Sequence, residues 1–148
     1  MTASTRRELR SADHTKHFPV SVEAIDNDRD LAVLKIPEEL NSLQPIPVHN
    51  GSPVANGSAA ILCGYPNHFA ARPLRIEHGL VIRTFPKGGI SYLEITPKII
   101  AGNSGGPLLN EAYEFIGVAV RGINETTTLT EAEFLAVNGT ELRDWRGI

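Results

Sequence analysis

Short apolar runs, separated by glycine, proline and asparagine, set the strongest limit on how this chain can fold. The β-type runs cover residues 17–25, 31–36, 58–63, 74–85, 90–96 and 115–120. Only the stretch at residues 140–145 has a helical pattern. Many short strands at this spacing are typical of a β-sandwich or of a pair of β-barrels. We therefore predict an all-β fold with a short C-terminal helix.

The runs also predict how the strands are buried and where the chain divides. Residues 31–36 are apolar on both faces apart from Lys35, which is the pattern of a strand covered on both sides. Residues 45–53 are rich in proline, asparagine, glycine and serine, as expected of a linker. A chain of 148 residues can hold one domain or two small barrels. We predict the remainder of a first barrel within residues 1–48 and a second barrel within residues 54–148.

Charge and apolar content exclude several classes of partner. The net charge of −3 gives no electrostatic argument for binding nucleic acid or an anionic membrane. No segment is long and apolar enough to span a bilayer. The first seventeen residues lack the apolar stretch of a signal peptide. If Met1 is the natural start, these features predict a cytoplasmic protein.

Cysteine and histidine usage argues against a metal centre. Cys63 is the only cysteine, so neither an intramolecular disulfide nor a cysteine-based metal cluster can form. It stands in an apolar run, where a small buried hydrophobic residue is expected. No histidine has metal-ligand spacing to another histidine, cysteine or carboxylate. We predict no metal and no cofactor.

The hexapeptide at residues 102–107, Gly-Asn-Ser-Gly-Gly-Pro, is the segment most directly tied to chemistry. Its glycines permit backbone angles that side chains forbid. Such a loop can direct successive N–H groups at one point, as stabilisation of a developing oxyanion requires. The motif therefore indicates Ser104 as a nucleophile. A glycine-rich hairpin turn without chemistry is the alternative.

This hexapeptide resembles the nucleophile loop of the trypsin-like (chymotrypsin-fold) serine peptidases, in particular their compact bacterial and HtrA-type branch. Residues 28–36, Asp-Arg-Asp-Leu-Ala-Val-Leu-Lys-Ile, are similar to the family's segment that carries the orienting aspartate. Residues 64–66 resemble the turn after the first strand of the second barrel, and residues 116–122 the strand that lines the substrate cleft. Residues 134–137 are similar to the family's C-terminus.

The resemblance implies two antiparallel β-barrels and a serine endopeptidase that acts on peptides or proteins. It implies that Ser104 is the nucleophile and that Asp30 orients the base. The N–H groups of Gly102 and Ser104 would form the oxyanion hole. A turn residue that opens a strand is the alternative for Asp30.

The resemblance also implies a primary specificity pocket. Lys98 stands six residues before Ser104, where the family has the floor of that pocket. Val120, Arg121 and Gly122 would line its wall. The basic side chains of Lys98 and Arg121 would favour an acidic substrate side chain, although solvated surface positions are an equal alternative.

The chain departs from the family at the histidine. In the family the order is histidine, aspartate, serine, and only His14 and His17 precede Asp30. Neither stands in the family's small-residue context. If residues 17–25 are extended, His14 lies roughly 30 Å from Asp30, whereas a triad needs hydrogen bonds of about 3 Å. We therefore predict an N-terminally truncated peptidase domain that is nearly inactive alone.

The other histidines follow Asp30 in the sequence. His49 lies in the predicted linker, His68 in a loop and His78 near a strand glycine. Solvated polar residues are the expected reading for all of them.

Two further interpretations remain open. The chain could be a non-catalytic module that binds peptides or proteins, or a bent strand could bring His14 into a compact triad. In either case an incomplete first barrel exposes strand edges. A partner chain or self-association is expected to cover them.

Overall fold

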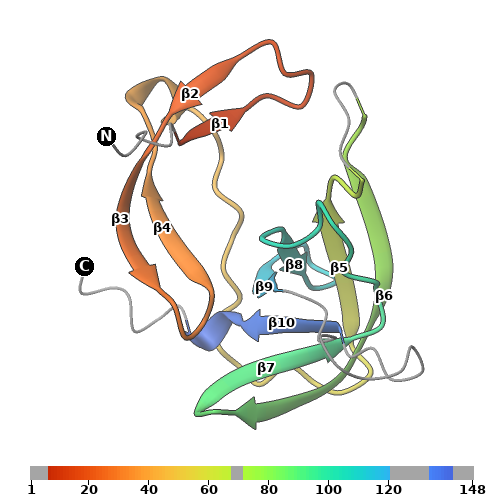
Figure 1. Ribbon diagram of the computed structural model, residues 1–148. Helices are drawn as coiled ribbons and strands as arrows, with labels where there is room; N and C mark the ends of the chain where they lie inside the picture. Colours follow the sequence, from red (N-terminus) through yellow and green to blue (C-terminus); the bar gives the residue numbers. More distant parts are fainter. Residues whose placement is uncertain (1–6, 68–71, 121–133, 142–148) are drawn as a thin grey trace. The chain divides into compact units, whose positions relative to one another are not determined.

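The computed structural model describes residues 7–67, 72–120 and 134–141 (Figure 1). The described elements are β-strands and short 3-10 segments, so the all-β prediction is confirmed. The chain forms two compact units, Met1–Pro45 with Phe69–Pro73, and Ile46–His68 with Leu74–Ile148. These units are defined by contacts within the chain. The predicted division into folding domains at residues 1–48 and 54–148 stays a prediction.

The first unit contains two separate hairpins. Strand β1 (Glu8–Arg10) pairs with β2 (His17–Pro19), and β3 (Ser21–Asp26) pairs with β4 (Leu31–Lys35). The 3-10 helix η1 (Glu38–Leu40) follows. Within the described part of the chain these sheets stay two-stranded, so each hairpin keeps unpaired edges.

Strand β4 differs from its predicted environment. Its sequence predicts burial on both faces, yet Val33 and Leu34 are 36% and 40% exposed. Ile36, directly after the strand, is 42% exposed. A two-stranded sheet has no neighbouring strands or second layer to cover both faces of a strand. The burial prediction for this strand is therefore wrong for the chain as described.

The second unit is a closed barrel whose strands follow the order β10-β7-β6-β5-β8-β9. Their bounds are β5 Ala59–Gly64, β6 Arg75–Lys87, β7 Ile90–Ile95, β8 Pro107–Leu109, β9 Phe115–Ala119 and β10 Phe134–Asn138. All of the pairings between neighbours are antiparallel. Strand β10 pairs with both β7 and β9 and so closes the ring.

Branched aliphatic side chains fill the barrel. The core cluster consists of Ala60, Leu62, Val81, Leu93, Ile95, Ile99, Leu108, Ile116, Ala119 and Ala136. The alternation of inward and outward residues along each strand brings these side chains to one interior. The hairpin between β6 and β7 turns at Gly88 and Gly89, both with positive φ as a type I′ turn requires.

Each of the six predicted runs contains a strand of the structure. Strands β8 and β10 lie outside those runs, and the predicted helix also differs. Strand β8 was not expected, because it is short and begins with Pro107. Residues 139–141 form a single 3-10 turn, and the rest of the predicted helix at 140–145 lies outside the described residues. No helix in the described segments has the length and apolarity that a bilayer crossing needs.

We expect Leu93→Ala to lower the free energy of unfolding by about 2–5 kcal/mol, because it leaves a cavity among fully buried neighbours. The matched control is Leu80→Ala in the same unit. Leu80 is 50% exposed, and we expect a loss of about 1 kcal/mol or less. Urea denaturation of both variants provides the measurement, and equal losses would contradict the assignment of the core.

Candidate active site

The loop that carries Ser104 is attached to the end of strand β9. The N–H of Gly105 donates to the carbonyl of Ala119 at 2.7 Å, and the N–H of Ala119 donates to the carbonyl of Gly106 at 2.9 Å. Ser104 itself is exposed. The strand therefore fixes the backbone directly after the serine while the hydroxyl remains accessible.

The segment before the serine is held by the turn that follows strand β5. The N–H of Tyr65 donates to the carbonyl of Gly102 at 3.0 Å, and the N–H of Asn67 donates to the carbonyl of Ala101 at 2.8 Å. The loop is thus held on one side by β9 and on the other by residues 64–67. Both supports belong to the barrel.

Two N–H groups of the loop remain available. Among the described residues, neither the N–H of Gly102 nor that of Ser104 donates a hydrogen bond, and the Ser104 hydroxyl has no partner. Unused donors beside an exposed nucleophile are the feature that oxyanion stabilisation needs. These are the two N–H groups that the sequence predicts for this role.

Glycine is required at the closest approach of the loop to the barrel. Gly102 has a φ of +95°, and a Cβ there would lie 1.9 Å from the carbonyl oxygen of Tyr65. A Cβ at Gly106 would lie 2.2 Å from the carbonyl oxygen of Cys63. Gly105 differs, because its φ is +84° but a Cβ would meet nothing within 4 Å. The loop therefore depends on glycine for space at two positions and for backbone angle at a third.

Asn103, between Gly102 and the serine, is a buried side chain that sequence reasoning did not single out. It is 3% exposed, and its Nδ2 donates to the carbonyl of Lys98 at 3.1 Å. Its N–H donates to the carbonyl of Ile100 at 2.9 Å, and its carbonyl accepts from Gly106 at 3.0 Å. The only signal for it was its place inside the hexapeptide.

Asp30 lies in the first unit, at the end of the turn between β3 and β4. Its φ of +56° is a conformation that aspartate tolerates better than most residues. Asp26 orders this turn by accepting from the N–H of Arg29 at 3.0 Å and from its Nη1 at 2.7 Å. These hydrogen bonds from Arg29 lower the pKa of Asp26. The Asp30 carboxylate is exposed and accepts no hydrogen bond from the described residues.

The histidines of the first unit lie away from that turn. His14 is in the connection between β1 and β2, with a φ of +59°. Strand β2 is followed at once by β3, so the chain runs from this connection along both strands to the β3–β4 turn. Figure 1 shows the connection and the turn at opposite ends of the unit. The ring nitrogens of His17 face Glu8 Oε1 and the carbonyl of His14, each at 3.1 Å. The described fold does not bring either imidazole to Asp30.

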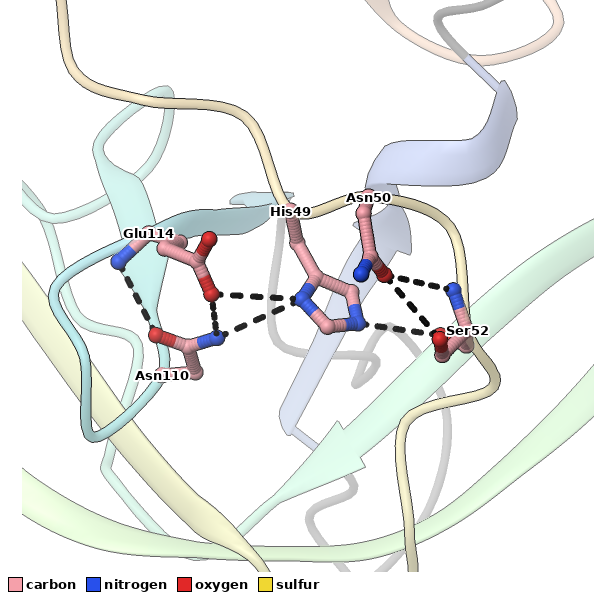
Figure 2. Close-up of polar contacts among 5 residues, drawn as sticks. All are labelled: His49, Asn50, Ser52, Asn110 and Glu114. Carbon is pink, nitrogen blue, oxygen red and sulfur yellow. Dashed lines mark hydrogen bonds and ion pairs between the residues drawn. The ribbon is translucent and has the colours of Figure 1, made fainter.

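His49 belongs to a polar cluster on the second unit (Figure 2). Its Nδ1 lies 3.4 Å from Glu114 Oε1, and its Nε2 lies 3.1 Å from the carbonyl of Ser52. Asn110 Nδ2 donates to the same Glu114 oxygen at 2.9 Å. Beside them, the N–H of His49 donates to the carbonyl of Phe115 at 3.1 Å. Through these contacts of His49 with Glu114 and Phe115, the predicted linker is hydrogen-bonded to the start of β9.

The remaining predicted residues are only partly described. His78 is exposed on β6, opposite Ile61, and His68 lies outside the described residues. Lys98 is exposed, and its N–H donates to Glu77 Oε1 at 3.4 Å. Val120 is half-buried, with its N–H donating to the carbonyl of Leu135 at 3.1 Å.

Arg121 and Gly122, predicted for the pocket wall, lie outside the described residues. The residues that are described contain no group of three or more metal-ligating side chains. Cys63 is half-buried, and burial raises the pKa of its thiol.

We expect Gly102→Ala to be much more destabilising than Gly105→Ala. Both substitutions place alanine at a positive φ, which costs about 1–2 kcal/mol. Only the first adds a clash with a backbone carbonyl, so we expect a loss of about 3–5 kcal/mol there. Urea denaturation measures both, and similar losses would show that the loop is not pressed against the turn at residues 64–67.

We expect Glu114→Gln to lower the stability of the chain at neutral pH. Hydrogen bonds from Asn110 and then His49 lower the pKa of Glu114 in the folded chain. The carboxylate therefore stabilises the fold above its unfolded pKa of about 4.3, and this contribution is lost as the pH falls through the lower folded value.

Urea denaturation at neutral pH and at about pH 3 tests this expectation. The difference between wild type and Glu114→Gln should shrink on acidification. Glu111→Gln is the matched control, because it removes the same charge from the exposed part of the same turn. A pH-independent difference for Glu114→Gln would contradict the role of the hydrogen bonds.

Several known proteins are similar to this chain in sequence. Residues 3–118 match the family model described as the trypsin-like peptidase domain. The chain is 30% identical over 123 residues to the mitochondrial serine protease HTRA2 of Drosophila virilis, covering 78% of this chain and 28% of that protein. The corresponding protein of Drosophila erecta is 31% identical over 122 residues, covering 77% of this chain and 28% of that protein.

A solved structure shows the same architecture. The crystal structure of the serine endoprotease from Yersinia pestis superposes with a TM-score of 0.75 at 22% identity, covering 97% of this chain and 48% of that one. This chain spans less than a third of the length of the two Drosophila proteins. The family match over most of the chain and the closed barrel agree, and the chain belongs to the trypsin-like peptidase domain family.

Proposed function

We propose that this chain carries the nucleophile and the orienting carboxylate of a serine endopeptidase that cleaves peptide bonds by acyl transfer. The observation that supports this most is the loop at residues 101–106. It combines an exposed Ser104 hydroxyl with the unused N–H groups of Gly102 and Ser104. A glycine turn with a purely structural role has no need for that combination.

In the proposed reaction, Ser104 Oγ attacks the carbonyl carbon of the scissile peptide while an imidazole accepts the hydroxyl proton. The oxyanion that forms accepts hydrogen bonds from the N–H groups of Gly102 and Ser104. The protonated imidazole then donates to the leaving amine, and water releases the acyl group by the reverse sequence. Asp30 would hold the imidazole in its tautomer and orientation.

The base of this proposed triad is not assigned to any of the described histidines. His14 lies at the other end of its unit from the Asp30 turn. His49 is engaged by Glu114 and the carbonyl of Ser52. We therefore infer that the imidazole comes from outside the described residues. On this proposal the chain alone hydrolyses peptides very slowly, because a triad without its base loses most of its rate.

The open edges of the first unit support a partner. Among the described residues each of its sheets has two strands, and Val33, Leu34 and Ile36 are partly exposed. Unpaired strands with apolar side chains are ready to pair with further strands. We infer that a partner chain or a second copy covers this unit, as the incomplete first barrel predicts.

The substrate pocket is proposed from Lys98, Val120, Arg121 and Gly122. Lys98 would favour an acidic substrate side chain if its charge faced the pocket. The carboxylate of Glu77 is 3.4 Å from the Lys98 amide. A carboxylate beside the backbone of the proposed pocket floor would repel an acidic substrate side chain, so we propose only a mild preference for acidic residues.

A non-catalytic peptide-binding module is the second candidate. The observation that favours it is that the histidines of the described first unit, His14 and His17, belong to the β1–β2 hairpin and not to the β3–β4 turn that holds Asp30. Such a module would bind peptides or proteins without turnover. The two proposals differ in whether the Ser104 hydroxyl reacts.

A fluorophosphonate probe distinguishes them. We expect the purified chain to be labelled slowly at Ser104, and labelling to rise when imidazole is added as an external base. Ser104→Ala, which removes the hydroxyl from an exposed position, should abolish labelling in both conditions. No labelling with or without imidazole would overturn the peptidase proposal in favour of the binding module.

The same assay tests the compact triad. If His14 is the base, His14→Ala should abolish labelling that imidazole then restores. We expect instead that His14→Ala labels at the wild-type rate. Circular dichroism of both alanine variants checks that each chain remains folded.

A further inference from the structure

We propose that Asn103 is a positioning residue: its side-chain amide, bonded to the carbonyl of Lys98, holds the loop in the conformation that leaves the N–H groups of Gly102 and Ser104 free for the substrate oxyanion. This inference rests on the proposed function of the loop. It assigns a role to a residue that does not itself touch the reacting atoms.

Burial makes the Asn103 side chain a fixed support. Asn103 and Asn138 are the buried polar residues of the described chain, at 3% and 7% exposure. A buried amide without hydrogen bonds is costly, so the bond from Nδ2 to the Lys98 carbonyl at 3.1 Å is a strong restraint. No buried side-chain polar atom of the described residues lacks a partner.

The barrel closes around the other side of this amide. A Cβ at Gly64 would lie 2.5 Å from Asn103 Oδ1 and 3.0 Å from its Cα. Gly64 is the last residue of β5. The end of this strand therefore approaches Asn103 as closely as glycine permits, and the side chain has no room to swing away.

The hydrogen bond closes the segment at residues 98–103, which contains one proposed oxyanion donor, Gly102, and ends directly before the other, Ser104. It joins Lys98 to Asn103, and the backbone bond from Asn103 N–H to the Ile100 carbonyl lies within the same span. Gly102 precedes the anchored residue and Ser104 follows it. Fixing Asn103 from its side chain therefore restrains the peptide groups on both sides.

The chemistry of the contact calls for an amide. The Lys98 carbonyl is an acceptor, so the side chain must offer a donor to it. Aspartate at this position would set a carboxylate oxygen against the carbonyl oxygen, and only its protonated form has a hydrogen to donate. The contact also joins the predicted pocket floor at Lys98 to the residue beside the nucleophile.

Amide hydrogen exchange tests the positioning role directly. The N–H groups of Tyr65, Gly105 and Gly106 are bonded only when the loop is in place. In Asn103→Ala we expect their protection to fall about tenfold or more, as loss of a buried hydrogen bond implies. Amides in the core strands β6 and β7 should retain their protection.

Asn138→Ala is the matched control in the same unit. Asn138 Nδ2 donates to Ser91 Oγ at 3.2 Å, and its Oδ1 accepts from the N–H of Thr140 at 3.1 Å. Its loss should leave the loop amides protected. The proposal is overturned if Asn103→Ala leaves loop exchange unchanged, or if Asn138→Ala changes it equally.

Asn103→Asp provides a second variant in case the alanine variant does not fold. At neutral pH this variant should lose the protection of the loop amides from hydrogen exchange. At about pH 4, protonation of the carboxyl group should restore that protection. A loss of protection that persists in acid would overturn the need for a donor to the Lys98 carbonyl.

Fluorophosphonate labelling separates this inference from the proposed function. If wild type is labelled, Asn103→Ala should be labelled at least about tenfold more slowly while Asn138→Ala is unchanged. If wild type is not labelled at all, the peptidase proposal fails, and the exchange experiment still decides whether Asn103 positions the loop.

Discussion

The candidate site depends on the close contact of backbone with backbone where the Ser104 loop meets the end of strand β5. Gly64 and Gly102 come from different parts of the sequence, and neither position has room for a Cβ. With side chains absent, the carbonyl of Gly102 can reach the N–H of Tyr65. The position of the loop is therefore set by steric exclusion as much as by attraction.

The barrel strands hold the contact between the Ser104 loop and the end of β5 in place. Strand β5 lies between β6 and β8, and β8 in turn pairs with β9, which holds the other side of the loop. Buried aliphatic side chains from these strands share one core cluster. A loop supported at both ends by packed strands keeps its geometry without substrate, which is what pre-organised stabilisation of charge requires.

The sequence predicted the strands well because alternation, glycine and proline are local signals. The β6–β7 hairpin is an example, since Gly88 and Gly89 both mark its turn and adopt the positive φ values that the turn needs. Strand β8 was missed because Pro107 argues against a strand when its neighbours are unknown. The exposure of Val33 could not be predicted, since burial depends on what covers a strand.

The candidate site was predictable in part for the same reason. Ser104 and Gly102 stand in a glycine-rich motif, and the motif alone predicts an exposed hydroxyl and available N–H groups. Asn103 was not, because its role arises from a carbonyl five residues earlier and from the close approach of Gly64. Asp30 and Ser104 belong to different compact units, so the proposal that they act together concerns tertiary arrangement, which no local sequence pattern encodes.

The closing strand of the barrel has a consequence for how the protein is made. Strand β10 lies downstream of Ser104 in the sequence, yet it pairs with β9, whose Ala119 is hydrogen-bonded to the loop. During synthesis the serine therefore leaves the ribosome well before the strand that completes its supporting wall. Because the barrel cannot close without its last strand, we expect the Ser104 loop to be among the later parts of the barrel to reach its final conformation.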